Sequence, residues 1–293
     1  MFISIITINY KKKDLTIACL KSLYDQFKKE FFQDQIEIII VDNASNDGSV
    51  ESIRGFIKKN NYLNSIILES KENGGFGKGN NLGVKSAKGE FLLFLNNDTT
   101  TEDNGILQMA KYLKEHADIS ILGGQLRNTD GSFQVSVGSF YSLGKAILLL
   151  LGMQRFGVVD KNPVIIKQVE WVKGGLLMIK KEVFEDLNGF DENIFMYTED
   201  MELCYRAKLK GYKTYFYPNV TVLHAEHGST CRTFAIVNIY KNLLYFYKKH
   251  KSYAEYMILK IILIIKAVFL SIVGKLIGSS YLLKTYKEAL RSI

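Results

Sequence analysis

The sequence predicts an α/β fold with a mostly parallel central sheet. Apolar strands and amphipathic helical segments alternate through the first half of the chain, and most of the strands are continuously apolar. Continuous apolar runs are typical of strands buried on both faces, whereas strands with one solvated face alternate apolar and polar residues. Strands that alternate with helices predict a parallel sheet covered by helices on both sides.

The expected elements follow from the periodicity of the apolar residues. The glycine-rich run 73–77 is expected to open a helix, Thr198 to cap the helix that begins at Glu199, and Gly211 to end that helix. Residues 127–167 show no regular period, and we expect acceptor-specific loops there. Strands are expected at 2–8, 36–41, 65–68, 91–95, 119–122, 171–179, 214–217 and 220–223, the last two as a pair. Helices are expected at about 15–27, from 49, from the run 73–77 to about 89, and at 102–116, 180–187 and 199–210.

Composition and charge narrow the class of protein. A hydrophobic content of 47% with only two prolines is typical of a globular chain. The net charge of +8 indicates an anionic partner, for which nucleic acid, anionic lipid and phosphorylated small molecules all qualify. Three widely spaced cysteines, Cys19, Cys204 and Cys231, fit neither a disulfide framework nor a zinc site and predict reduced thiols in a cytoplasmic protein. The apolar amino terminus lacks a basic leader and is expected to form a strand.

Four chemistry-bearing residues occur where such a fold binds ligands. Asp42 and Asp98 each follow an apolar strand, Asp200 lies in the first turn of a helix, and His224 ends a late strand. Open α/β sheets bind their ligands at the carboxyl ends of the strands, so Asp98 is a candidate metal ligand. Each residue also has a structural explanation: a turn for Asp42 and Asp98, the helix dipole for Asp200, and ordinary packing for His224.

The order of these residues and of their neighbours resembles the nucleotide-sugar glycosyltransferases of the GT-A fold, in the family 2 branch that includes rhamnosyltransferase-like enzymes. The resemblance covers about residues 2–230. Its motifs are Ser4-Ile-Ile-Thr-Ile-Asn-Tyr10, Val41-Asp-Asn-Ala-Ser-Asn-Asp-Gly-Ser49, Asn73-Gly-Gly-Phe-Gly77, Leu95-Asn-Asn-Asp98, Trp171-Val-Lys-Gly-Gly175, Thr198-Glu-Asp200, and His224 followed by Gly228-Ser229. It implies a Rossmann-like sheet flanked by helices and an inverting transfer of one sugar.

The resemblance implies a divalent metal, Mg²⁺ or Mn²⁺, held by Asp98 and His224. A hard cation with few protein ligands and phosphate oxygens suits a diphosphate leaving group. The Asp-X-Asp motif of the family appears here as Asn96-Asn97-Asp98, so its first carboxylate is missing. Asn96 is expected to contact the ribose of the donor, and Asn97 also belongs to the expected donor site.

The resemblance also assigns the nucleotide pocket. Asp42 is expected to accept a hydrogen bond from the imide N–H of a pyrimidine base, with Thr7 and Asn9 lining the pocket. Asn73 and Gly75 are expected to bring the backbone close to the donor, although a loop-to-helix junction also uses glycines. Lys78 is expected to contact phosphate.

The sugar and acceptor end of the site is assigned in the same way. Gly174 and Gly175 are expected to form a flexible loop beside the transferred sugar, with Trp171 as an apolar platform for donor or acceptor. Asp200 is the expected general base, because the acceptor hydroxyl must lose its proton as it attacks the anomeric carbon. Glu199 is its neighbour and competitor, and is expected to contact the acceptor.

The sequence divides into a catalytic domain, residues 1–234, and a helical region, residues 235–293, that is expected to associate with a membrane. Residues 257–283 are very apolar but contain Lys260, Lys266 and Lys275. A spanning helix needs roughly 20 apolar residues with few charges, so we expect helices that lie in the interface. The alternative is a buried helical pair packed on the main domain.

Together these features predict an enzyme on the cytoplasmic face of the membrane. It would transfer rhamnose from dTDP-rhamnose, or a hexose from a UDP-sugar, to a lipid-linked or growing cell-surface polysaccharide. The alternatives are a catalytically silent binding subunit and a sugar nucleotidyltransferase, although the glycine-rich loop of the latter is absent after the first strand. The basic residues are scattered, so no nucleic-acid partner is expected.

Overall fold

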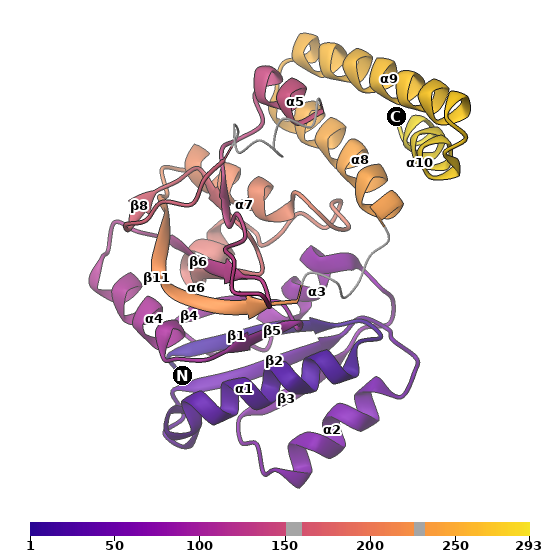
Figure 1. Cartoon of the computed structure of the whole chain (residues 1–293). Helices are drawn as coiled ribbons and strands as arrows, with labels where there is room; N and C mark the ends of the chain where they lie inside the picture. The colour runs from indigo at the N-terminus through magenta and orange to yellow at the C-terminus, as the bar shows by residue number, and fades with distance from the viewer. Residues whose placement is uncertain (151–159, 226–231) are drawn as a thin grey trace. The chain divides into compact units, whose positions relative to one another are not determined.

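A computed structural model of the protein (Figure 1) describes residues 1–150, 160–225 and 232–293. The strands are β1 (Ile3–Asn9), β2 (Ile36–Asp42), β3 (Ser65–Glu69), β4 (Phe91–Leu95), β5 (Thr99–Thr101), β6 (Ile121–Arg127), β7 (Val137–Gly138), β8 (Lys167–Gln168), β9 (Trp171–Val172), β10 (Leu176–Lys180) and β11 (Thr214–His224). The helices are α1 (Lys13–Phe32), α2 (Ser49–Lys59), α3 (Gly75–Val84), α4 (Gly105–Glu115), α5 (Leu143–Leu150), α6 (Lys181–Asp186), α7 (Glu199–Leu209), α8 (Arg232–His250), α9 (Tyr253–Leu276) and α10 (Ser280–Arg291).

The chain forms two compact units. Unit 1 comprises residues 1–139, 161–195 and 199–228, and unit 2 comprises residues 140–160, 196–198 and 229–293. Gly228, Ser229 and Cys231, which the sequence analysis singled out, lie outside the described residues. Every other residue of the candidate site belongs to unit 1.

Unit 1 is built on a mixed sheet. Within the described residues its strand order is β3-β2-β1-β4-β10-β6-β11-β5, and β8 pairs with β11. β1 pairs in parallel with β2 and β4, β2 with β3, and β6 with β11. β10 lies antiparallel between β4 and β6, and β5 is antiparallel to β11. The predicted mostly parallel sheet is confirmed.

Helices cover both faces of this sheet (Figure 1). Successive side chains of a strand point to opposite faces. On one face Ile3 and Ile5 pack in a buried cluster with residues of α1, α2 and α4, such as Leu20 and Met109. On the other face Ile6 lies against α3, where a Cβ atom at Gly83 would come within 2.6 Å of it.

Some elements differ from the sequence-based prediction. The expected strand pair at 214–223 is the single strand β11, whose register shifts between Tyr217 and Thr221, next to Pro218. Proline cannot donate a ladder hydrogen bond, which accounts for the irregularity at this point. Gly211 has a φ of +86° and follows the end of α7, as expected of a C-terminal stop. Thr198 does not cap α7, because its buried hydroxyl has no partner among the described residues.

Unit 2 is helical. α9 packs against α8, α10 and α5, and begins with a capping box in which Ser252 and Glu255 exchange hydrogen bonds. Asn242 of α8 donates to the carbonyl oxygens of Met196 and Tyr197, at 2.8 Å each. Among the described residues only α9 is long and apolar enough to cross a membrane, and 22% of its most apolar stretch is buried.

Candidate active site

Polar side chains gather where the parallel strands β1, β2 and β4 end. Asn9 and Asp42 are direct neighbours in the register of β1 and β2. β4 pairs with the other side of β1 and runs into Asn96, Asn97 and Asp98. As predicted from the sequence, the carboxylates of Asp42 and Asp98 lie at or just after the ends of buried parallel strands.

A buried hydrogen-bond network holds the carboxylate of Asp42. Asn9 Nδ2 donates to Asp42 Oδ1 at 2.6 Å, and the hydroxyl of Ser45 donates to the same oxygen at 2.6 Å. The backbone N–H of Ser45 donates to Asp42 Oδ2 at 2.9 Å. A carboxylate has about four lone-pair sites, so three donors leave one acceptor position on Asp42.

The network continues from β1 to the polar residues after β4. Thr16 donates to Asn9 Oδ1 at 2.9 Å and accepts from Asn97 Nδ2 at 2.9 Å. The hydroxyl of Thr7 is buried and has no hydrogen-bond partner among the described residues. Leaving a buried hydroxyl unpaired costs free energy, and a donor or acceptor on a ligand would remove that cost.

A second cluster joins the end of β4 to the end of β11. Asp98 Oδ1 lies 3.2 Å from His224 Nε2, and Asn96 Nδ2 lies 3.0 Å from the same nitrogen. The backbone N–H of Ala225 donates to the carbonyl oxygen of Asp98 at 3.0 Å. Two strands that are distant in sequence thus place a carboxylate and an imidazole side by side.

Gln134 fixes the proton on His224. Its Nε2 donates to Asn128 Oδ1 at 2.7 Å and to the carbonyl oxygen of His224 at 3.1 Å. Its Oε1 therefore faces His224 Nδ1, 2.8 Å away, and accepts the N–H of that nitrogen. In the neutral ring His224 Nε2, on the side of Asp98, then carries the lone pair, which is the form that binds metals.

The Asp98–His224 pair fits a divalent cation. Two ligands that each bind Mg²⁺ at about 2.1 Å and at right angles lie about 3.0 Å apart. The observed separation is 3.2 Å. Within the described ranges no group of three or more His, Cys, Asp or Glu side chains could hold a metal. The remaining coordination positions would belong to phosphate and water, as is common for Mg²⁺.

The turn between β9 and β10 connects this cluster to Asp200. The carbonyl oxygen of Gly175 accepts from the backbone N–H of Asn96 at 3.2 Å. The N–H of Gly174 donates to Asp200 Oδ2 at 2.9 Å, and the N–H of Met201 donates to Asp200 Oδ1 at 2.7 Å. Gly174 and Gly175 thus contact the polar segment that follows β4 on one side and the start of α7 on the other.

Burial separates the roles of Glu199 and Asp200. Burial, and secondly the charge of Asp200, raise the pKa of Glu199 from 4.5 to about 8. Burial also raises the pKa of Asp200, but the N–H groups of Gly174 and Met201 oppose this. Near neutral pH Glu199 therefore holds a proton, while the two backbone N–H groups favour the charged form of Asp200. Asp200 is the better base of the two.

Several expected site residues have partners inside the protein. Gly75 has a φ of +78°, and a Cβ there would lie 1.8 Å from the carbonyl oxygen of Phe195, so packing alone requires a glycine. Asn73 Oδ1 accepts from the N–H of Gly75 at 3.1 Å. Lys78 forms an exposed ion pair with Glu72 at 2.6 Å.

Trp171 packs in the small ribbon formed by β7 and β9. Its Nε1 donates to the carbonyl oxygen of Ser139 at 3.0 Å, and its ring occupies the space that a Cβ at Gly138 would fill. These contacts account for its position without a ligand. The donor and acceptor roles of Asn73, Gly75, Lys78 and Trp171 stay predictions.

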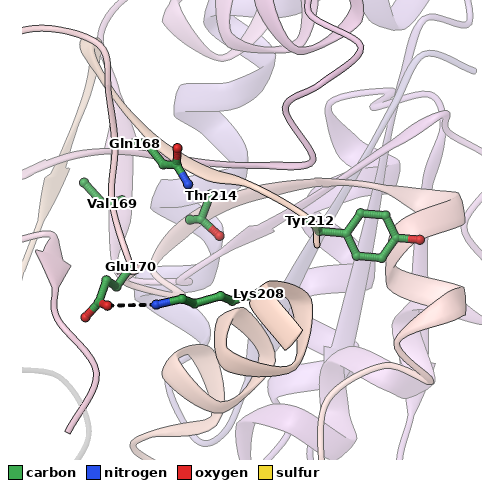
Figure 2. Close-up of a pocket in the computed structure, with 6 residues that line it drawn as sticks. All are labelled: Gln168, Val169, Glu170, Lys208, Tyr212 and Thr214. Carbon is green, nitrogen blue, oxygen red and sulfur yellow. Dashed lines mark hydrogen bonds and ion pairs between the residues drawn. The ribbon is translucent and has the colours of Figure 1, made fainter. Parts of the chain in front are cut away.

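A cavity of about 330 Å³ lies elsewhere on unit 1 (Figure 2). Glu170 and Lys208 form an ion pair of 3.1 Å within it, at the opposite end of α7 from Asp200. None of the residues that line it belongs to the expected site. It is therefore separate from the cluster at the strand ends.

Comparison with known proteins identifies the family. Residues 4–186 match the profile described as glycosyl transferase family 2, which is more than half of the chain. The chain belongs to this family. Residues 162–228 also match a profile described as the N-terminal domain of galactosyltransferase. The resemblance stated from the motifs is confirmed.

Individual relatives agree with this assignment. Rhamnosyltransferase WbbL of Escherichia coli K12 is 29% identical over 163 residues, which are 52% of this chain and 61% of WbbL. The poly(ribitol-phosphate) beta-glucosyltransferase of Bacillus spizizenii is 35% identical over 133 residues, 45% of this chain and 20% of that protein. The chain therefore spans about three fifths of the length of WbbL and one fifth of that of the glucosyltransferase.

A solved structure shares the fold. The mannosyltransferase PcManGT from Pyrobaculum calidifontis, in complex with GDP-Man and Mn²⁺, aligns with a TM-score of 0.59 and 18% identity. The alignment covers 99% of this chain and 74% of PcManGT. The predicted GT-A fold is confirmed.

Three residues that contact the candidate site residues were not assigned a role from the sequence. Gln134 lies in the irregular segment 127–167, where no motif marks it. Thr16 and Ser45 occur where a helix and a turn begin, and polar residues are common there for local reasons. The spacing of Ser45, three residues after Asp42, was the one available signal.

Replacing Glu199 by Gln should remove a pH-dependent component of stability. Because its pKa is raised to about 8, the folded protein keeps a proton that the unfolded chain releases above about pH 4.5. This contribution is complete below pH 4.5 and disappears as the pH rises through 8. Between pH 5 and pH 8 the wild-type protein should lose on the order of a few kcal/mol of unfolding free energy that Glu199→Gln does not lose.

Urea unfolding at the two pH values measures this difference. The matched control is Glu51→Gln, at an exposed position of α2, which should show the wild-type pH dependence. Equal pH dependence in wild type and Glu199→Gln would mean that Glu199 is ionised in the folded protein.

Proposed function

We propose that this chain is an inverting, metal-dependent glycosyltransferase that moves a single sugar from a nucleotide-sugar to a cell-surface glycan. Membership of family 2 supports sugar transfer. The observation that carries the proposal is the turn at Gly174 and Gly175, which joins the Asp98–His224 pair to the carboxylate of Asp200. A site for the diphosphate and a base for the acceptor then lie on the two sides of one turn.

The donor proposed is dTDP-rhamnose, with a UDP-hexose as the alternative. The name of the relative WbbL supports rhamnose, and that of the Bacillus spizizenii relative supports glucose. Thymine and uracil both present an imide N–H, for which Asp42 keeps one acceptor position. The unpaired hydroxyl of Thr7 lies on the same strand as Asn9 and would complete the pocket.

Asp98 and His224 would hold Mg²⁺ or Mn²⁺. Such an ion, when bound, neutralises the charge that develops on the leaving diphosphate. PcManGT, solved with GDP-Man and Mn²⁺, supports a divalent cation in this fold. Gln134 contributes by keeping the lone pair of His224 on Nε2, toward Asp98.

Asp200 acts as general base in the proposed reaction. The acceptor hydroxyl oxygen forms a bond to the anomeric carbon, the bond from that carbon to the diphosphate oxygen breaks, and the hydroxyl proton passes to Asp200. One direct displacement inverts the anomeric configuration. Burial raises the pKa of Asp200 and so strengthens it as a base, while two backbone N–H groups orient the carboxylate.

The acceptor proposed is a lipid-linked or growing polysaccharide at the cytoplasmic face of the membrane. The relative from Bacillus spizizenii is named for a polymeric acceptor, poly(ribitol-phosphate). A very apolar helix in unit 2 is consistent with an acceptor that is carried on lipid.

A thermal-shift panel tests the donor site. UDP, dTDP, GDP and CDP should be compared with and without Mn²⁺, since a ligand at 100 times its Kd stabilises by about 2.7 kcal/mol. We expect a metal-dependent rise in Tm with dTDP or UDP. A folded sample that responds to none of the four nucleotides would contradict the proposal and favour a silent binding subunit.

Asp200→Asn should abolish sugar transfer without loss of donor binding. The amide keeps the shape of the side chain but cannot accept the proton, and a general base contributes roughly 10² to 10⁴ in rate. Turnover of the donor should fall by that factor, while the nucleotide-induced shift in Tm should remain.

Asp118→Asn is the matched control for this substitution. Asp118 forms an exposed ion pair with Lys213, and its replacement should leave turnover unchanged. Near-normal turnover by Asp200→Asn would exclude Asp200 as the base.

Gln134→Leu should weaken metal binding. Loss of the acceptor at His224 Nδ1 frees the imidazole to carry its proton on Nε2, where it blocks metal binding. Groups that orient a metal-binding histidine typically contribute 10 to 100-fold in affinity. Calorimetric titration with Mn²⁺ in the presence of dTDP should show a Kd increased by that factor.

The ¹⁵N chemical shifts of the His224 ring provide a second measurement. They should report the Nδ1-protonated form in the wild type and a mixture in Gln134→Leu. Gln108→Leu, on the exposed face of α4, is the control. Unchanged affinity and unchanged ring shifts in Gln134→Leu would disprove this role.

A further inference from the structure

The net positive charge of this chain is concentrated at one end of the sequence, although the individual basic residues are scattered along it. Residues 232–293 contain eleven of the 38 Lys and Arg but only two of the 30 Asp and Glu, a net charge of +9. The rest of the chain therefore has a net charge of −1. A segment with such an excess attracts an anionic surface, and the remainder of the protein does not.

The same segment exposes an apolar stripe along α9. The stripe residues lie three or four positions apart, which places them on one face of the helix. Their exposed fractions range from 46% to 80%. They are Ile258, Ile261, Ile265, Phe269, Ile272 and Leu276.

The opposite face of α9 is buried inside unit 2. Leu259, Leu263 and Ala267 are fully buried, and α9 packs against α8, α10 and α5. At Gly274 a Cβ would lie 2.8 Å from the Cβ of Leu282, so α9 and α10 are in close contact. One face of α9 is thus packed against the protein, and its exposed large apolar side chains, the stripe and the adjacent Val268, lie on the other face.

This packing argues against a helix that crosses a bilayer. α10 packs against α9 and exposes Lys284, Lys287 and Arg291 to solvent. If α9 crossed the hydrocarbon layer, these cations would be drawn in with it, which is costly for each charge. A helix that lies parallel to the surface buries the stripe and leaves these groups in water.

We propose that α9 lies flat in the interfacial layer of an anionic lipid bilayer, with the stripe facing the acyl chains. Lys260, Lys266 and Lys275, which interrupt the apolar sequence, all lie outside the stripe. Lys266 and Lys275 flank the stripe on its two sides, from where their long side chains reach the lipid phosphates, and Lys260 lies toward the packed face. The inference goes beyond the proposed sugar transfer, because it concerns unit 2 and is measured without donor or acceptor.

Vesicle sedimentation of the full-length protein tests the surface. Vesicles of phosphatidylcholine alone are compared with vesicles that also contain roughly 30% phosphatidylglycerol, which gives them the negative surface charge of an anionic membrane. The wild type should bind the anionic vesicles and should be released by salt. The triple variant Ile261→Ser, Ile265→Ser, Phe269→Ser should bind at least about tenfold more weakly.

The matched control removes three exposed apolar side chains from unit 1. Phe32→Ser, Val164→Ser and Ile165→Ser replace residues that are 65%, 91% and 67% exposed. This variant should sediment as the wild type does. Equal binding by the stripe variant and the wild type would overturn the proposal.

Spin-label depth distinguishes a flat helix from a spanning one. Ile258→Cys, Ile265→Cys and Ile272→Cys are labelled in a Cys231→Ser background, since Cys19 and Cys204 are buried. A flat helix gives the same depth at all three positions. A spanning helix would separate positions 258 and 272 by about 21 Å, at 1.5 Å per residue, and that result would overturn the proposal.

Light scattering tests the alternative that a second copy of this chain, and not lipid, covers the stripe. If the wild type is a dimer, the stripe variant is a monomer and neither binds vesicles, the stripe mediates self-association and the lipid proposal is overturned. The proposal predicts the same mass for both proteins in the absence of lipid.

Discussion

The candidate site depends on one tight turn, formed by Gly174 and Gly175 between β9 and β10. It accepts a hydrogen bond from the backbone of Asn96 and donates one to the carboxylate of Asp200. A Cβ at Gly174 would lie 3.1 Å from the ring of Phe76, and one at Gly175 would lie 3.2 Å from Asn96 Nδ2. Both positions are tighter than ordinary contacts, so the small residues let the strand that carries Asp98 and the helix that carries Asp200 approach each other. This approach sets the distance between the carboxylate of Asp98, proposed to act at the diphosphate, and that of Asp200, proposed to act at the acceptor.

Neutral groups decide where the protons and charges of the site reside. Two backbone N–H groups stabilise the charge of Asp200, and burial leaves the adjacent Glu199 protonated. The amide of Gln134, itself oriented by two acceptors, selects the tautomer of His224. The buried network around Asp42 consists of an asparagine, a serine and a backbone N–H. The charge of Lys173 also favours the ionised form of Asp200. Among the described residues neither Asp42 nor Asp98 forms an ion pair with Lys or Arg, so a divalent ion and a nucleotide would meet carboxylates that no such cation neutralises.

The sequence predicted the part of this architecture that depends on local pattern. Continuous apolar runs gave β1, β2 and β4, and with them the position of Asp42 and Asp98 at one edge of the sheet. The antiparallel insertion of β10 between β4 and β6 was not predictable, because pairing between distant strands leaves no periodicity in either segment. Gln134 was missed for a related reason: it acts only because β11 delivers His224 to it from 90 residues away. The flanking glycines of the turn were recognised, but their contacts with Asn96 and Asp200 required the fold.

The central claim is that Asp98 and His224 form the metal site, and that Asp200 stands apart from it as a base. A crystal structure of the protein with dTDP and Mn²⁺, with anomalous data at the manganese edge, tests this most directly. The account predicts one manganese peak within bonding distance of Asp98 and His224 Nε2, about 2.2 Å, with the carboxylate of Asp200 free of metal. A manganese peak on Glu199 or Asp200, or a nucleotide complex with no metal at Asp98, would contradict it.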